Sequence, residues 1–131
     1  MRIFLLILIL IFPKQSFGNC EKAANVTRVV AAGGSLTEII YYLGHQKYLV
    51  ARDLTSNFPP EAKKLPSIGY VRNLSSEGLL SLSPSLIISE ADAGPRHVIE
   101  QVKRTAVDFR AIKDDYDTKS ILNKISCIGK I

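Results

Sequence analysis

Short apolar runs alternate with amphipathic segments along the chain from residue 27 onward, each punctuated by glycine, proline or serine. The apolar runs predict buried strands over 27–32, 48–51, 85–89 and 107–112. The segments between them predict helices over 36–43, 75–82 and 95–105, a helical turn over 61–64, and a last helix from 118 onward. Strands and helices in alternation are typical of a parallel sheet covered by helices. The sequence therefore predicts an α/β fold with a single Rossmann-like lobe.

The expected helix starts and the last helix carry more specific predictions. Ser35 with Glu38 three residues later has the pattern of a capping box, and Ser75 or Ser76 is placed to cap the short second helix. The last helix should carry an apolar face, with no following element to bury it. That face would consist of Ile121, Leu122, Ile125 and Ile128.

The first 18 residues have the pattern of a secretory signal peptide. Arg2 precedes an apolar run of about ten residues, and the segment ends in Ser16-Phe17-Gly18, which fits a cleavage site. The run is too short for a membrane span, which needs about 20 apolar residues. We therefore expect cleavage after Gly18 and export to the periplasm. Cleavage would remove Arg2 and Lys14 and no acids, so the net charge would fall from +5 to +3.

The two cysteines leave two questions open. An exported chain permits a disulfide, but the wide spacing of Cys20 and Cys127 does not establish one. Cys20 also lies where a lipoprotein would carry its lipid anchor. Such sites require a small residue directly before the cysteine, and Asn19 fits that poorly. We expect a soluble exported protein rather than a lipoprotein.

Several kinds of chemistry find no support in the sequence. No basic stripe interleaves with aromatic residues, so a nucleic-acid partner is not expected. The turn at Gly33-Gly34-Ser35 lacks the GK[ST] and GxGxxG patterns, which favours a tight turn into a helix over a phosphate site. His45 and His97 lack metal-ligand spacing and are expected at the surface. The acidic residues Asp114, Asp115 and Asp117 lack the pattern of a calcium loop and are interpreted as a solvated turn. No catalytic constellation emerges, so a binding protein rather than an enzyme is expected.

Tyr70 stands in a loop instead of a periodic apolar segment, and Arg72 follows two residues later. A phenol ionises at about pH 10 in water, but ferric iron lowers that value and takes tyrosinate as an axial haem ligand. A nearby cation would stabilise the anion. If the segment is extended, the guanidinium would lie near the phenolate oxygen or near a haem propionate. Spacing alone favours two surface residues over a haem site.

Three stretches together resemble the haem-binding periplasmic proteins of bacterial haem ABC importers, which are relatives of the cobalamin- and siderophore-binding proteins. They are RVVAAGGSLTEIIYYLG, ARDLTSNFPPEAKKLPSIGYVRNLSSEGLLSLSPSLII, and ADAGP followed by a helix. The likeness covers residues 28 to about 109 in register.

The resemblance implies a function and roles for three residues. Tyr70 would be the axial ligand of the iron of haem b, the transported ferric hemin, and Arg72 would support it. Glu77, in the first turn of the short helix, would dock onto the inner-membrane ABC permease. The chain would receive haem from an outer-membrane receptor and serve iron uptake.

Family members are much longer, with two α/β lobes joined by a long helix. The resemblance therefore implies an N-terminal lobe over 19–117 and the start of the inter-lobe helix over 118–131, truncated before the second lobe. Two alternatives remain open: a cobalamin- or ferric-siderophore-binding lobe, and a non-functional exported fragment.

Overall fold

A four-stranded parallel sheet forms the centre of the molecule in the computed structural model, which describes residues 20–131. The expected signal peptide over 1–18 lies outside the described residues. The strands are β1 (Val29–Ala32), β2 (Leu49–Arg52), β3 (Leu86–Glu90) and β4 (Asp108–Ile112), in the order β2-β1-β3-β4. Every pairing is parallel, which confirms the predicted fold class.

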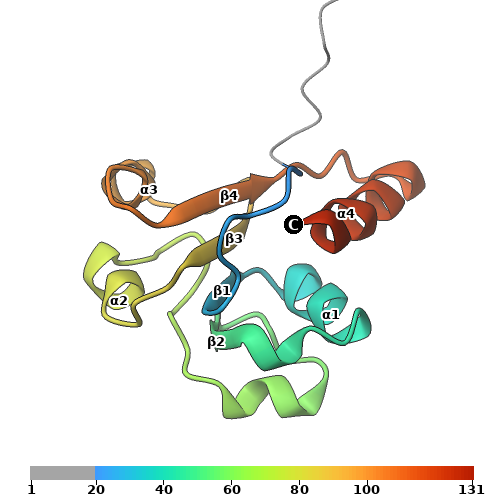
Figure 1. Ribbon diagram of the computed structural model, residues 1–131, viewed down its shortest axis with the longest axis horizontal. Coiled ribbons are helices and arrows are strands. Elements are labelled where there is room, and N and C mark those ends of the chain that lie inside the picture. The colour runs from blue at the N-terminus through green and yellow to red at the C-terminus, as the bar shows by residue number, and fades with distance from the viewer. Residues whose placement is uncertain (1–19) are drawn as a thin grey trace, which may run out of the picture.

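Helices cover both faces of this sheet (Figure 1). They are α1 (Gly34–Tyr42), α2 (Ser76–Leu80), α3 (Arg96–Lys103) and α4 (Thr118–Lys130), with 3-10 turns at η1 (Gln46–Tyr48) and η2 (Pro60–Lys64). Alternate strand residues face opposite layers: Val29 and Ala31 pack in the core with α1 and α4, while Val30 and Ala32 pack with α2 and α3. In the part of the chain that the structure describes, no helix is long and apolar enough to cross a membrane.

The turn from β1 into α1 differs from the sequence prediction. Gly33 is the N-cap and α1 begins at Gly34, so Ser35 lies inside the first turn and the predicted capping box is wrong. The Ser35 hydroxyl instead donates to Glu90 Oε1 at 2.6 Å. Gly33 has a φ of 153°, and a Cβ there would lie 2.5 Å from Glu90 Cγ. Glycine is therefore required because β3 approaches this turn so closely.

The cap of α2 follows one of the two predicted alternatives. Ser75 is the N-cap, and its Oγ accepts a hydrogen bond from the Gly78 amide at 2.8 Å. Glu77 lies in the first turn of the helix, where the helix dipole favours a carboxylate.

The buried face of α4 is more polar than the predicted apolar stripe. Ile121 and Leu122 are 54% and 63% exposed, as expected for an uncovered stripe. Ile128 is buried in the core beside α1, so the expectation that nothing covers it is wrong. The helix buries Ser120, Lys124, Cys127 and Ile128. The apolar pattern missed two of these because Ser120 and Lys124 find polar partners inside the fold.

A disulfide joins Cys20 to Cys127 across 107 residues of sequence, which answers the question that the sequence left open. The same segment is tied down by the Ala23 amide, which donates to the Ile131 carbonyl at 3.0 Å. A crosslink across a loop of this length contributes about 2–5 kcal/mol to the free energy of unfolding.

Candidate functional site

The sheet topology marks one place for a ligand. From β1 in the centre, the chain moves through α1 to β2 on one side and then returns to β3 on the other. Open parallel sheets bind ligands outside the carboxyl ends of the strands at such a reversal. Gly33 follows β1 here, Asp53 follows β2, and Glu90 ends β3.

Backbone hydrogen bonds bring Tyr70 to this end of the sheet. The extended segment before it runs alongside the end of β2. The Ile68 amide donates to the Arg52 carbonyl at 2.9 Å, and the Leu54 amide donates to the carbonyl of the residue before Tyr70 at 2.8 Å. The segment therefore acts as an additional edge beside β2 and ends with Tyr70.

A turn then brings Arg72 onto Tyr70. The Asn73 amide donates to the Tyr70 carbonyl at 2.8 Å, and the buried Val71 anchors the turn in the core. The extended geometry considered from the sequence is thus wrong for these residues. The predicted contact nevertheless forms, with Arg72 Nη1 donating to Tyr70 Oη at 3.0 Å. The tyrosine is 40% exposed.

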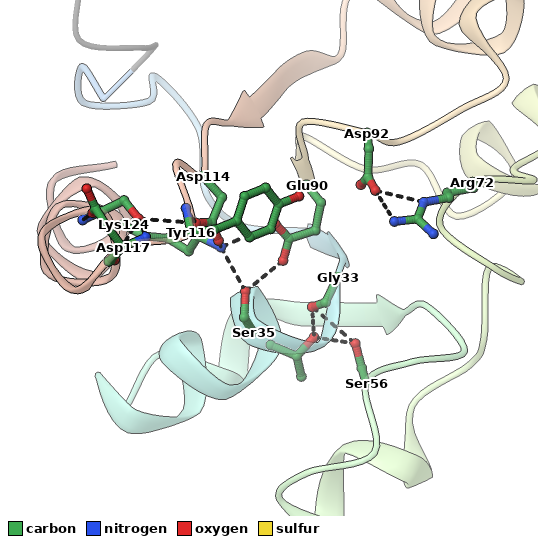
Figure 2. A network of polar contacts seen from close by, with 12 residues as sticks. Gly33, Ser35, Ser56, Arg72, Glu90, Asp92, Asp114, Tyr116, Asp117 and Lys124 are labelled. Carbon is green, nitrogen blue, oxygen red and sulfur yellow. Dashed lines mark hydrogen bonds and ion pairs between the residues drawn. The ribbon is translucent and has the colours of Figure 1, made fainter.

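Asp92, which the sequence did not single out, pairs with Arg72 (Figure 2). Its Oδ2 accepts from Arg72 Nε at 2.7 Å and also from Nη2. The hydrogen bond and charge of Asp92, followed by those of Tyr70, raise the pKa of Arg72. The only available sequence signal was the position of Asp92 within ADAGP, one of the stretches that carry the family resemblance.

Two large, exposed apolar side chains on the loop after β2 were also missed. Leu54 is 57% exposed and Phe58 is 61% exposed. Both lie in the loop after β2, and the Leu54 amide is bonded to the residue that precedes Tyr70. Exposed apolar groups beside a polar ligand group are typical of a site for a large, mostly apolar molecule.

A buried polar network fixes this loop to the start of α1. Asp53, which has no exposed surface, accepts from the Ser56 hydroxyl at 2.6 Å and from the Thr55 hydroxyl at 2.7 Å. The Ser56 and Thr37 hydroxyls lie 2.7 Å apart, and both contact the Gly33 carbonyl (Figure 2). Because every member is hydrogen-bonded, the network can hold the loop in one arrangement.

A second network, around Lys124, lies on the α1 and α4 side of the same sheet end (Figure 2). The Lys124 ammonium donates to Asp114 Oδ2, to Ser35 Oγ at 3.1 Å and to Glu90 Oε2 at 3.3 Å. Burial acts to lower the pKa of Lys124, but its hydrogen bonds and carboxylate neighbours outweigh burial and raise it. The Lys124 hydrogen bond, followed by that of the Tyr116 amide, lowers the pKa of Asp114.

These contacts correct the interpretation of the acidic cluster as a solvated turn. Asp114 binds the buried Lys124, and Asp117 caps α4 by accepting from the Ser120 amide at 2.6 Å. Asp115 is exposed and pairs with Lys113 at 2.8 Å, as a surface residue would.

The remaining predicted residues lie at the surface. His45 and His97 are exposed, as expected, and His45 stacks on Tyr48 with ring centroids 5.9 Å apart. Glu77 is exposed on α2. Among residues 20–131, no group of three His, Cys, Asp or Glu side chains is arranged to hold a metal ion.

Solved structures of similar fold include two haem-binding proteins. The chain matches a periplasmic haem-binding protein from Pseudomonas aeruginosa with a TM-score of 0.76 and 36% identity, over 79% of this chain and 37% of that chain. It matches a periplasmic haem-binding protein of Vibrio cholerae with a TM-score of 0.75 and 35% identity, over 81% of this chain and 41% of that one. These matches confirm the resemblance inferred from the sequence.

The curated relatives include vitamin B12-binding proteins. The protein of that name from Pectobacterium carotovorum subsp. carotovorum (strain PC1) is 31% identical over 80 residues, which are 61% of this chain and 29% of that protein. The chain therefore spans less than a third of the length of this relative. Residues 29–131 match the periplasmic binding protein family, and the chain belongs to that family.

Proposed function

We propose that this chain binds ferric haem in the periplasm, with Tyr70 as the axial iron ligand, and delivers it to an inner-membrane ABC permease. The observation that carries the proposal is Tyr70, a partly exposed residue at the carboxyl end of the sheet, whose Oη accepts a hydrogen bond from Arg72 Nη1 at 3.0 Å. With iron bound, the Arg72 guanidinium would donate a charge-assisted hydrogen bond to the coordinated tyrosinate oxygen.

The surroundings of Tyr70 support a porphyrin as the ligand. A porphyrin is a broad, flat and mostly apolar molecule, and the exposed Leu54 and Phe58 lie on the loop beside Tyr70. Similar structures at 35% and 36% identity are haem-binding proteins. Haem would be cargo and not a catalytic cofactor, as befits a family of binding proteins.

Cobalamin is the second candidate, because the curated relative at 31% identity binds vitamin B12. The corrin ring is also large, but it does not require a tyrosinate from the protein. The Tyr70–Arg72 contact therefore favours haem.

Titration with hemin tests the proposal. The purified protein should develop the spectrum of a high-spin ferric tyrosinate, and excess cyanocobalamin should not displace the hemin. Metal-free protoporphyrin is the matched control, because it offers the same apolar surface without iron and should bind more weakly. Binding of cyanocobalamin together with an absent tyrosinate band would favour the second candidate. No binding of either ligand would refute both.

The proposed route begins at an outer-membrane haem receptor and ends at the permease, where Glu77 is the proposed docking residue. Glu77→Ala should leave the hemin spectrum unchanged and slow haem transfer to the cognate permease in proteoliposomes. Loss of one exposed ion pair is worth up to about 1 kcal/mol, or about fivefold. Glu38→Ala, which alters an exposed glutamate on α1, is the matched control. Equal transfer rates for the two variants would contradict this role.

A further inference from the structure

We infer that Asp92 is the positioning residue of the haem site, because it fixes Arg72 so that the guanidinium stays on the Tyr70 oxygen. The inference rests on the proposed function and adds a residue to it. Asp92 is hydrogen-bonded to Arg72, and Arg72 in turn to Tyr70, so Asp92 would act through Arg72.

The hydrogen-bond pattern shows how Asp92 sets the direction of the guanidinium. Asp92 Oδ2 accepts from both Nε and Nη2, so one edge of the planar group is occupied. The remaining terminal nitrogen, Nη1, then points toward Tyr70 Oη. A planar donor group held along one edge cannot rotate freely, so the hydrogen bond to the phenol oxygen is set in advance of ligand binding.

The backbone holds Asp92 in place relative to the tyrosine loop. The Gly94 amide donates to the Val71 carbonyl at 3.0 Å, and the Leu74 amide donates to the Gly94 carbonyl at 2.8 Å. Two backbone hydrogen bonds therefore join the loop that carries Asp92 to the loop that carries Tyr70. Val71 and Leu74 are both buried in the core with α2 and α3, which anchors the pair of loops to the lobe.

The ion pair also sets the charge beside the iron. Arg72 and Asp92 together are neutral, and a ferric porphyrin core with one bound tyrosinate is neutral as well. Arg72 therefore contributes a directed hydrogen bond to the phenolate and is not available as a free cation for a haem propionate.

Global stability does not explain this arrangement. The Arg72 and Asp92 side chains are 60% and 41% exposed, and exposed ion pairs contribute little to folding. Asp92→Asn should therefore fold normally. An effect on haem can then be separated from an effect on the fold.

The test is a double-mutant cycle between Asp92 and Arg72, read out by hemin release and by the tyrosinate band. Asp92→Asn should speed hemin release about 5- to 30-fold and shift the band, and Asp92→Glu should restore both in part. In an Arg72→Ala background, Asp92→Asn should change release by less than about twofold, because the residue through which it acts is gone. Asp115→Asn, which breaks an exposed ion pair elsewhere, is the matched control.

A ligand-free measurement keeps this inference distinct from the proposed function. In nitrogen-15 NMR of the apo protein, the Arg72 Nε–H signal should be protected from solvent exchange and lose that protection in Asp92→Asn. If the wild-type signal is protected but hemin produces no tyrosinate band, the proposed function is refuted, and with it any haem role of Asp92. If the wild type gives a normal band, and Asp92→Asn and Asp115→Asn have the same hemin release rate and the same band, this inference alone is overturned. An undiminished effect in the Arg72→Ala background would also overturn it.

Discussion

Tyr70→Phe should abolish the tyrosinate charge-transfer band of the hemin complex. The substitution keeps the aromatic ring and removes only the oxygen that would coordinate iron. Loss of an outer-shell partner of a metal costs roughly 10- to 100-fold in affinity, and loss of the ligand itself should cost more. Hemin titration by absorbance and resonance Raman spectroscopy would measure the band and the affinity together.

The chain offers close controls for this experiment. Tyr42 is 83% exposed on α1, so Tyr42→Phe removes a phenol oxygen from the surface without touching the site. It should leave the hemin spectrum unchanged, and so should substitutions of the exposed His45 and His97. A normal spectrum in Tyr70→Phe, together with its loss in a histidine variant, would show that the iron ligand is misassigned.

The fold was largely predictable because its determinants are periodic. The strands in the centre of the sheet are buried on both faces, so they read as continuous apolar runs such as VVAA and LIIS. The helices between them show apolar residues at helical spacing and end at glycine, proline or serine. These signals placed the elements to within a few residues. The start of α1 was misread because the proximity of Glu90 to Gly33, which decides where Ser35 points, is not encoded locally.

The site was predictable only in part. Family resemblance singled out Tyr70 and Arg72, and the structure brings them into contact. Asp92 was missed because its partner is 20 residues away in sequence, with helix α2 and strand β3 between them. Asp53 was missed for a related reason: a single buried aspartate in a loop looks like any surface aspartate until the fold surrounds it with hydroxyl groups.

Lys124→Met should destabilise the protein strongly. The Lys124 side chain is only 4% exposed and lies between the carboxylates of Asp114 and Glu90. Removing the cation leaves two partly buried carboxylates close together without compensation, and breaking a buried pair in this way costs about 3–5 kcal/mol. Urea unfolding followed by circular dichroism would measure the loss. Glu90→Gln added to Lys124→Met should recover part of it, because one of the uncompensated charges is then gone.

The pH dependence of that loss identifies its cause. Since the pKa of Asp114 is lowered in the folded protein, its contribution to stability is present above its unfolded pKa and is lost as the pH falls through the folded value. The wild type should therefore lose stability below about pH 4, while Lys124→Met loses less, because its carboxylates can take up protons in the folded state. The difference in free energy of unfolding between the wild type and Lys124→Met should therefore become smaller as the pH falls. Lys113→Met breaks the exposed pair with Asp115 and is the control. Its free energy of unfolding should differ from that of the wild type by no more than about 1 kcal/mol at every pH. A Lys124→Met deficit that stayed constant from pH 7 to acid would mean that lost packing, and not the uncompensated carboxylates, causes the destabilisation.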